Sequence, residues 1–337
     1  MQVVDEVGFD EWQEVADKCK YATFFHTPTW SMIFAQTYPE MEIATKKFIF
    51  DHKRKVILPL IKIKAAKGLS GSYISNVAGV YGGVISEQEI TQEEISQVFN
   101  SLINKQIRTI SITGAPFFDY TLPSKFKMKE DFTQIIKLGK NEREIEVGFE
   151  YSARKQINKA KRAGVICREA KDFAEWEEYY SIYQEAIKKW GKKATSHYPL
   201  SLFKNIFKAR TQNMPKIKLW LVILEDKIVG GNLNFYHNSH CVEWHACFLS
   251  DFFKYGIRNF LVHRIICDAN RSGYKYYDFN PSGGHQGTVR FKESFGPENV
   301  KIKRWRWEKP LVKTITIVKR KIASGLRLCG YHNEKLS

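Results

Sequence analysis

The chain has 337 residues, of which 43% are hydrophobic and 14% aromatic; this is enough apolar material for about two packed domains and excludes wholesale disorder. No apolar run approaches the length of a membrane-spanning helix, and the acidic segment 1–10 lacks the apolar stretch of a secretory signal. The six cysteines form neither a CxxC pair nor a metal-finger spacing. We therefore expect free thiols and a cytoplasmic protein.

The positive charge is concentrated in the second half of the chain. Residues 1–150 contain 18 Lys and Arg against 20 Asp and Glu, whereas residues 151–337 contain 35 against 16, so the second half accounts for the whole net charge of +17. This asymmetry favours a polyanionic partner, which could be nucleic acid, a nucleotide-linked substrate, a coenzyme with phosphates or an anionic membrane. A solvated basic surface without a partner is the alternative.

Hydrophobic periodicity predicts helices and strands in residues 1–150. A helix is expected at Phe9–Cys19, and Thr27 followed by Pro28 has the residue types of a helix start. Two alternating runs, Lys46–Asp51 and Val56–Lys62, predict a hairpin.

The clearest helix start lies further along this half, where Thr91 and Glu94 form a capping box. One apolar stripe follows it, made of Ile95, Val98, Phe99, Leu102 and Ile103. A strand is expected after this helix, at Thr109–Thr113.

The second half repeats this order of elements. Helices are expected at Phe173–Lys189, Pro199–Thr211 and Asn259–Ser272, and strands at Leu219–Leu224, Ile228–Tyr236, His240–Leu249, Tyr274–Phe279 and Lys301–Trp307. The sequence therefore predicts an α/β (α+β) fold made of two copies of one unit, with domains at residues 1–150 and 151–310. The second domain is the basic one and is expected to carry the catalytic residues.

Two basic helices are expected next to this second unit. Residues 152–164 contain five cations in nine residues: Arg154, Lys155, Lys159, Lys161 and Arg162. They form either a solvated face or a surface that contacts phosphates. After Pro310, Leu311–Leu328 is expected to be a basic amphipathic helix, which either packs on the first domain or lies on a membrane surface.

The segment from Leu249 to Asn259 joins an expected strand to an expected helix. Backbone N–H groups and the positive end of the helix dipole suit a phosphate group at such a place. Gly256 would allow close approach, and Arg258 would add a fork of donors. The segment has neither a GxGxxG motif nor a P-loop, so a plain strand–helix connection is the alternative.

The expected strand at His240–Leu249 contains several polar side chains. Alternation places Cys241, Glu243, His245 and Cys247 on one face and Val242, Trp244, Ala246 and Phe248 on the other. The four polar residues would spread too far along the strand to bind zinc, so no metal site is predicted. Glu243 is the candidate proton acceptor, with His245 as the other possibility and a satisfied buried polar group as the alternative.

The most informative stretch is Gly273–Gly296. Within it, Asn280-Pro281-Ser282-Gly283-Gly284 predicts a turn, and a segment with Arg290 and Lys292 follows. A cation that reaches an acyl carbonyl or a phosphate would stabilise the negative charge of a transition state. An exposed surface charge is the alternative for Lys292.

Three motifs follow one another along the second half of the chain: Arg154-Lys155…Lys159-Ala160…Gly164, Gly273-Tyr274…Asp278-Phe279 and Arg290-Phe291-Lys292…Phe295-Gly296. Together with Phe25-His26-Thr27-Pro28-Thr29-Trp30 and Leu58-Pro59-Leu60, they resemble the FemAB-like transferases of the GNAT acyltransferase superfamily. The resemblance covers roughly residues 20–310, and its most specific part is the Arg-Phe-Lys-x-x-Phe-Gly motif.

The resemblance implies two tandem GNAT-like domains, each a mixed twisted sheet flanked by helices, with the C-terminal helix returning to the first domain. It implies transfer of an acyl or aminoacyl group to an amine of a cell-envelope precursor, sugar or peptide. The donor would be aminoacyl-tRNA or acyl-CoA, with no tightly bound cofactor. The family's functional lysine maps onto Lys292. No long helical hairpin is inserted in the second half, which leaves the use of tRNA open.

The sequence-based site has Lys292 and Glu243 as catalytic residues. The expected donor- and substrate-binding residues are Tyr255, Gly256, Arg258, Asn259, Asn280, Ser282, Gly283, Gly284, His285 and Arg290. Expected partners are a phosphate-bearing donor and an amine acceptor, either nucleotide-linked or lipid-linked, with peripheral membrane contact as a further possibility. The alternatives are an acyl-CoA-dependent N-acetyltransferase of polysaccharide or small-molecule metabolism and a non-catalytic RNA- or membrane-binding protein.

Overall fold

The computed structural model describes residues 1–64, 71–75, 77–103, 107–139, 141–191, 196–212, 216–283 and 285–310. Two sequence-based predictions lie outside these ranges: Gly284 as a binding residue, and the basic helix after Pro310 with its packing on the first domain. Among the described residues, no helix has both the length and the apolar character needed to cross a membrane.

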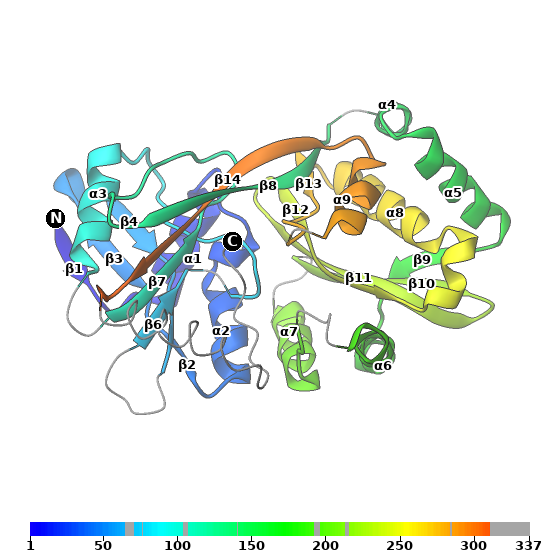
Figure 1. Ribbon diagram of the computed structural model, residues 1–337, viewed down its shortest axis with the longest axis horizontal. Coiled ribbons are helices and arrows are strands. Elements are labelled where there is room, and N and C mark those ends of the chain that lie inside the picture. Colours follow the sequence, from blue (N-terminus) through cyan, green and yellow to red (C-terminus); the bar gives the residue numbers. More distant parts are fainter. Residues whose placement is uncertain are drawn as a thin grey trace, which may run out of the picture.

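Most strands belong to one large mixed sheet that both halves of the chain build (Figure 1). In spatial order its strands are β2 (Met41–Ile43), β5 (Ile61–Ile63), β6 (Gly71–Ile74), β7 (Ile107–Thr113), β14 (Glu298–Glu308), β8 (Lys127–Lys137), β13 (Tyr276–Asp278), β12 (His240–Phe248), β11 (Lys227–His237), β10 (Ile217–Leu224) and β9 (Ile166–Glu169). A smaller sheet in the first half has the order β1 (Gln2–Val4), β3 (Lys46–Ile49), β4 (Lys55–Leu58). The predicted hairpin of the first half is formed by β3 and β4, which pair antiparallel, but the run predicted at Val56–Lys62 splits into β4 of the small sheet and β5 of the large one. The strands predicted at Leu219–Leu224 and Ile228–Tyr236 also pair antiparallel, as β10 and β11.

The two halves have the same arrangement near the centre of the sheet. In the first half, β6 and β7 are parallel neighbours connected through α3 (Gln92–Ser101); in the second, β12 and β13 are parallel neighbours connected through α8 (Ile257–Arg271). The next strand of each half pairs with the other half. Strand β8, which follows β7 in the chain, pairs with β13, and β14, which follows β13, pairs with β7. Strands β8 and β14 also pair with each other. The sheet is therefore continuous across residue 150, and the domain boundary there stays a prediction.

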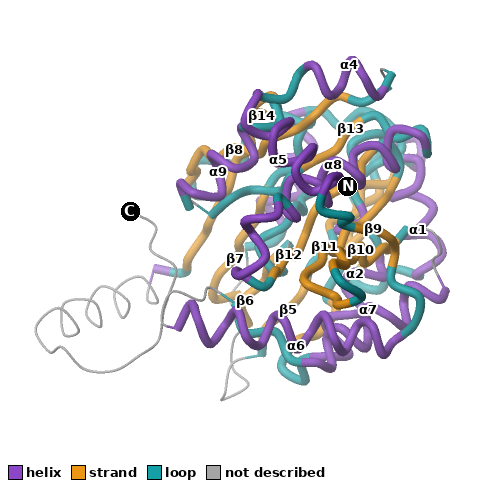
Figure 2. Tube along the Cα trace, turned by 90° about the vertical axis from the view of Figure 1, so that its right-hand side faces the viewer, coloured by secondary structure: helices purple, strands orange, loops and turns teal. Residues whose placement is uncertain are grey.

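Helices cover both faces of the sheet in the second half (Figures 1 and 2). On one face, called here the α6 face, α6 (Phe173–Trp190) and α7 (Leu200–Gln212) pack on Leu219, Leu233 and Phe235. On the other, the α8 face, α8 and α5 (Tyr151–Arg162) pack on Val222, Val229 and Tyr236. The remaining helices are α1 (Phe9–Lys18), α2 (Pro28–Thr37), α4 (Glu142–Val147) and α9 (Gln286–Glu293), the last of these beside α8.

Local sequence signals account for the starts of the predicted helices in the first half. Thr91 Oγ1 accepts a hydrogen bond from the Glu94 N–H (3.2 Å), and Glu94 Oε2 accepts one from the Thr91 N–H (2.9 Å). The capping box is thus formed as predicted, and α3 begins there. Pro28 is the first residue of α2, as predicted, but the Thr27 hydroxyl does not cap the helix; it donates to the Phe24 carbonyl instead (2.7 Å).

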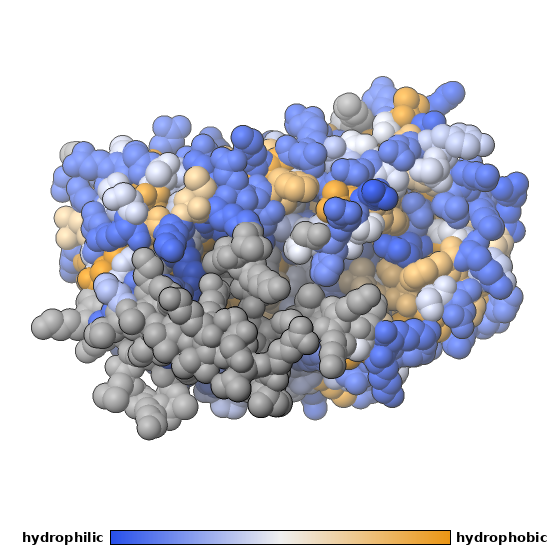
Figure 3. Space-filling view, viewed as in Figure 1, coloured by the Kyte–Doolittle hydropathy of each residue, from blue (hydrophilic) through white to orange (hydrophobic). Residues whose placement is uncertain are grey.

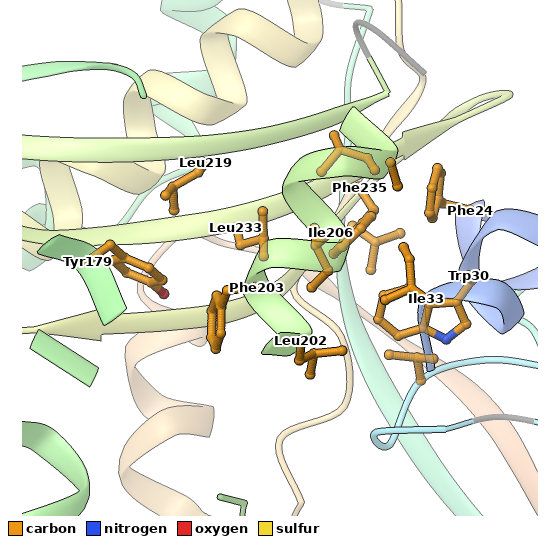
Figure 4. Close-up of a cluster of buried hydrophobic side chains, with 14 of the residues drawn as sticks. Phe24, Trp30, Ile33, Tyr179, Leu202, Phe203, Ile206, Leu219, Leu233 and Phe235 are labelled. Carbon is orange, nitrogen blue, oxygen red and sulfur yellow. The ribbon is translucent and has the colours of Figure 1, made fainter. Parts of the chain in front are cut away.

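A large hydrophobic cluster joins the two halves (Figure 4). Residues of the first half, Phe24, Trp30 and Ile33, pack in it against residues of β10, β11, α6 and α7. The Phe235 ring of β11 lies 5.0 Å from the rings of both Phe24 and Trp30. Buried aromatic side chains contribute most to such cores, so the halves form one packed body.

Two segments differ from the sequence-based expectations. Strand β8 was not predicted, because its residues from Lys127 to Phe132 are largely exposed and polar and only Thr133–Ile136 are buried. The segment Gln286–Glu293, for which neither a helix nor a strand was predicted, is the helix α9. On this helix Arg290 and Lys292 point different ways, since Arg290 is exposed and Lys292 is buried. The predicted mixed α/β sheet with flanking helices is confirmed.

Candidate functional site

Strand β12 continues beyond the end of its parallel neighbour β13. The two strands pair only as far as Val242 and Asp278. From Glu243 onward, no described strand pairs with this edge of β12, while the other edge stays paired with β11. Glu243 to Ala246 are partly exposed, although β12 is an interior strand of the sheet. Strand pairing between β12 and the chain after Asp278 thus ends at a place called here the β12–β13 opening, where no described strand pairs with the backbone N–H and C=O groups of β12 and a ligand could do so.

A β-bulge at Trp244 decides which way the side chains of β12 point. Leu233 of β11 is opposite His245, but the next residue of β11, Asn234, is opposite Glu243, so Trp244 is an extra residue. The predicted common face of Cys241, Glu243, His245 and Cys247 is therefore wrong. Glu243 lies on the α8 face, whereas His245 lies on the α6 face against rings of α6 and α7. Nowhere in the described ranges are three or more His, Cys, Asp or Glu residues placed to hold a metal ion.

On the α8 face, two donors hold the carboxylate of Glu243. Its Oε2 accepts hydrogen bonds from Asn232 Nδ2 and from Tyr277 Oη, each at 2.8 Å. Asn234 Nδ2 in turn donates to Asn232 Oδ1 (3.1 Å) and orients that amide. Burial and the charge of Glu243 raise the pKa of Tyr277, so its hydroxyl remains a donor. Within the described chain, Glu243 Oε1 has no hydrogen-bond partner, so it can accept one from a ligand.

Lys292 is buried on the inner side of α9, with 4% of its surface exposed. Its Nζ donates to the carbonyl oxygens of Phe279 (2.8 Å) and Asn280 (2.7 Å), where the chain leaves β13. Burial lowers the pKa of Lys292, while the negative charges of Glu243 and Asp278 oppose this shift. The described residues use two of the three ammonium hydrogens and leave the third without a partner. A positive charge is thus fixed at the end of β13.

Asp278 is a buried carboxyl group that the sequence analysis did not select. Its Oδ1 accepts hydrogen bonds from Thr133 Oγ1 (2.6 Å), the Asn280 N–H (2.8 Å) and Tyr81 Oη (3.1 Å). Burial raises its pKa to about 6, although these hydrogen bonds act in the opposite direction. Since Tyr81 belongs to the first half and Thr133 to β8, the network joins both halves of the chain at the end of β13.

Arg258, in the first turn of α8, lies among phenyl rings. Its Cζ is 4.1 Å from the ring centre of Phe291, 5.2 Å from that of Phe253 and 6.0 Å from that of Phe248. Burial lowers the pKa of Arg258, and the negative charge of Glu243 opposes this shift. No ion pair or hydrogen bond of the guanidinium occurs within the described chain, and the side chain is partly exposed. Its donors are therefore available to an anion at the start of α8.

The turn before α8 contains the other residues expected to bind the donor. It consists of the 3₁₀ helix η4 (Ser250–Tyr255) and Gly256, which has a φ of +75°. A Cβ at Gly256 would lie 2.2 Å from the carbonyl oxygen of Gln156 in α5. The glycine is thus required by the packing of α5, which differs from the predicted reason, close approach of a phosphate. Tyr255 and Asn259 are partly exposed on either side of it.

The loop from β13 to α9 holds the remaining predicted residues that the structure describes. Asn280 is buried with a φ of +59°, and its Oδ1 has no partner in the described chain. The Ser282 carbonyl accepts a hydrogen bond from the His285 N–H (3.1 Å), which begins α9, and Gly283 between them has a φ of +57°. The side chains of His285 and Arg290 are exposed, and no described contact connects them with the charges around the opening.

Sequence reasoning missed several polar residues of this site: Asn232, Tyr277, Asp278 and Tyr81. A signal existed for two of them, because Asn232 interrupts the apolar run Ile228–Tyr236 and Asp278 stands between aromatic residues. Polar residues in buried strands need partners and often mark a site. Tyr81 lies in a glycine-rich loop, and only the tertiary structure brings it to Asp278.

Comparisons with known proteins agree with this architecture. Residues 148–293 match a family model described as an acetyltransferase (GNAT) domain. The crystal structure of FemX superimposes with a TM-score of 0.71 at 12% identity, over 94% of this chain and 100% of that chain. The C-terminal domain of a putative lysylphosphatidylglycerol synthetase from Agrobacterium fabrum gives 0.53 at 10% identity, over 96% and 100%. L-PGS from Bacillus licheniformis gives 0.50 at 12% identity, over 83% and 89%. No curated protein sequence matches the chain significantly.

Similarity at these identities concerns the fold. It confirms the predicted fold class, a mixed α/β architecture with two GNAT-like domains, and it confirms the resemblance to FemAB-like proteins. The matched segment contains the β12–β13 opening with Glu243, Arg258 and Lys292. Residues 148–293 are therefore similar to a GNAT domain, within a chain that has a FemX-like fold over nearly its whole length.

Proposed function

We propose that the protein is a FemAB-like transferase that moves an acyl or aminoacyl group from a phosphate-bearing donor to an amine at the β12–β13 opening. The observation that carries this proposal is a break in the sheet with three charged side chains around it, Lys292, Glu243 and Arg258. A donor arm that contains amide or ester carbonyls can bind along the free edge of β12 as an added strand would. This would hold the reacting carbonyl close to the charges.

On this proposal the donor approaches from the α8 face. The unpaired guanidinium of Arg258 and the backbone N–H groups at the start of α8 suit a phosphate. Helix α5 packs against the same turn and exposes four cations, Lys155, Lys159, Lys161 and Arg162, in a region where hydrophilic residues gather (upper right in Figure 3). Arg154 is not among them, because its Nη1 donates to the carbonyl oxygen of Phe149 (2.7 Å). A row of cations longer than one pyrophosphate favours aminoacyl-tRNA over acyl-CoA.

The name of one similar structure supports an aminoacyl donor. A lysylphosphatidylglycerol synthetase is, by its name, a protein that joins a lysyl group to a lipid. For the present chain the resemblance to FemAB-like transferases points to an amine of a cell-envelope precursor, sugar or peptide as acceptor. Such acceptors are nucleotide-linked or lipid-linked, and a lipid-linked one would bring the protein to a membrane surface.

The proposed chemistry assigns separate roles to Lys292 and Glu243. Attack of a neutral amine on the acyl carbonyl places negative charge on the carbonyl oxygen, and the free N–H of the Lys292 ammonium would stabilise it. The amine must also lose a proton, and Glu243 Oε1 is the acceptor without a partner. Both groups are already oriented by hydrogen bonds, Glu243 to side chains of β11 and β13 and Lys292 to backbone carbonyls just after β13.

A transfer assay tests this function. The full chain is incubated with charged tRNA or with acetyl-CoA, each labelled in the acyl group, and with primary amine acceptors. We expect labelled amide from charged tRNA, at a rate that falls with added salt as phosphate contacts weaken. Transfer from acetyl-CoA alone would reduce the function to that of an acyl-CoA-dependent N-acetyltransferase. No transfer from either donor, together with salt-sensitive binding of RNA or vesicles, would establish the non-catalytic alternative.

A further inference from the structure

His245 borders the β12–β13 opening on the face opposite to Glu243. The bulge at Trp244 turns its imidazole to the α6 face. There the rings of Tyr183 (4.5 Å) and Phe203 (5.4 Å) lie nearly perpendicular to it. The residue is partly exposed, because β12 has no strand partner on this edge. The ring of His245 is thus tightly packed, and the residue is partly exposed beside the opening.

The hydroxyl of Tyr179 determines which nitrogen of His245 carries the proton. Tyr179 Oη lies 2.7 Å from His245 Nδ1 and 3.1 Å from the His245 carbonyl oxygen. Both contacts are hydrogen bonds only if the hydroxyl donates its proton to the carbonyl oxygen, which can only accept. The contact with Nδ1 is then a hydrogen bond only if Nδ1 carries a proton and donates it to Oη. Nε2 is therefore left with a free lone pair, and no group in the described chain hydrogen-bonds to it.

The environment keeps this ring neutral. Burial lowers the pKa of His245 to about 3, so the imidazole is uncharged near pH 7. Beside it, Trp244 and Tyr198 are partly exposed, with ring centres 5.6 Å and 6.1 Å from that of His245. The α6 face of the opening thus offers one hydrogen-bond acceptor next to an aromatic wall.

We propose that this place is the binding site of the acceptor, with His245 Nε2 accepting a hydrogen bond from the attacking amine and Trp244 and Tyr198 packing against the stem that carries it. The proposal rests on the proposed function and adds the chemical class of the acceptor: a primary amine on an aliphatic chain or on a sugar ring. The donor and the acceptor then occupy opposite faces of the sheet and meet at the opening.

The transfer step balances with the groups present. The amine nitrogen, with its lone pair directed by the hydrogen bond to Nε2, forms a bond to the acyl carbon. The acyl–oxygen bond of an ester donor, or the acyl–sulfur bond of a thioester, breaks. One amine proton passes to Glu243 and from there to the leaving oxygen or sulfur. His245 stays neutral throughout and acts by binding and orienting the amine.

NMR of the protein with ¹⁵N-labelled histidine tests the site without any need for turnover. The His245 signals are identified by their loss in His245→Gln. We expect a neutral Nδ1–H tautomer in the wild type, a mixture of tautomers in Tyr179→Phe, and a shifted Nε2 resonance when 1,5-diaminopentane or glucosamine is added. The amine that causes the shift distinguishes an aliphatic stem from a sugar stem. An Nε2–H tautomer in the wild type, or an Nε2 resonance that neither amine moves, would overturn the proposal.

Kinetics separate this proposal from the proposed function. Tyr179→Phe is expected to lower kcat/KM for the amine about tenfold, the loss of roughly one oriented hydrogen bond, and to leave the KM of the donor unchanged. The matched control is Tyr21→Phe, because the Tyr21 hydroxyl also donates to a backbone carbonyl, that of Val84, at 3.1 Å. This control should change neither kcat/KM for the amine nor the KM of the donor. If no donor supports transfer but the Nε2 shift is present, the function fails and the amine site stands. If transfer occurs and Tyr179→Phe alters only the KM of the donor, the amine site fails.

Discussion

At the scale of single residues, the buried carboxyl group of Asp278 links the site to the stability of the fold. Three donors point at its Oδ1, while Oδ2 has no partner in the described chain. A carboxylate buried in this way is held in its charged form at a cost in folding free energy. The cost is tolerated at a place where the chain also fixes Lys292, whose positive charge acts on Asp278.

This cost should be visible as a pH dependence. The pKa of Asp278 rises from 3.8 to about 6 on folding, so the folded state binds the proton more tightly. The free energy of unfolding therefore falls as pH rises through this range, by about 1.4 kcal/mol between pH 5 and 7.5. Asp278→Asn removes this contribution. In denaturant unfolding, the free energy of unfolding of Asp278→Asn minus that of wild type should increase by this amount from pH 5 to pH 7.5. If this difference is the same at both pH values, the raised pKa of Asp278 is contradicted.

The residues of the site could be predicted from the sequence only in part. Lys292, Glu243 and Arg258 were selected by residue type, position and resemblance, and the structure places all three beside the opening. The side on which His245 lies could not be predicted. A bulge at Trp244 reverses the alternation of β12, and it depends on the pairing with β11 and not on the sequence of β12 itself.

At the scale of elements, the contact between α5 and α8 positions the proposed donor site. Gly256 has a left-handed backbone, and its missing side chain lets the Gln156 carbonyl of α5 approach. Arg258 follows in the first turn of α8. The geometry at the start of α8 therefore depends on this close packing.

A glycine pair separates the packing effect from the backbone effect. Gly256→Ala forces a clash at 2.2 Å in addition to a strained φ of +75°, whereas Gly164→Ala has a φ of +72° and no atom within 4 Å of the added carbon. We expect Gly164→Ala to lower the free energy of unfolding by about 1 kcal/mol and Gly256→Ala by about 3 kcal/mol. Equal losses in denaturant titrations would contradict the packing role.

Elements were predictable where local signals define them. The capping box of Thr91 and Glu94 gave the start of α3, since both hydrogen bonds form within one turn. Strand β8 had no such signal. Residues Lys127–Phe132 are mostly exposed, and the strand exists because it pairs with β13 and β14, which lie far away in the sequence. Strand exchange between the halves is a tertiary property that no local pattern contains.

At the scale of the whole molecule, three buried histidines lie where the halves meet. His26 of the first half and His237 and His240 of the second each have a pKa lowered to about 4, mainly by burial. His26 Nε2 contacts the Gly82 carbonyl, and His237 Nε2 contacts the Ala16 carbonyl, each at 3.1 Å. Charge on a neighbouring histidine further lowers the pKa of His26 and of His240. The charge of Lys216 lowers the pKa of His237, and that of Asp17 raises it.

Acid should therefore weaken the contact between the halves. A histidine whose pKa is 6.5 unfolded and about 4 folded contributes stability that is present above pH 6.5 and is lost as pH falls towards 4. The loss is about 2 kcal/mol per histidine between pH 7.5 and 5. His240→Phe, which keeps a ring against Phe117 and Tyr276, should reduce the pH dependence of unfolding by this amount. His197→Gln, at an exposed position, should not change it.

Acyl transfer at the β12–β13 opening, as proposed, depends on Lys292 as its fixed positive charge. The most direct test is the single-turnover rate of amide formation from charged tRNA, measured for wild type and for Lys292→Met, with circular dichroism as the check on folding. Removal of one oxyanion-stabilising donor typically lowers such a rate about 100-fold or more, and we expect a loss of this size, with Lys292→Arg retaining part of the rate. A folded Lys292→Met protein that forms the amide at the wild-type rate would contradict the account.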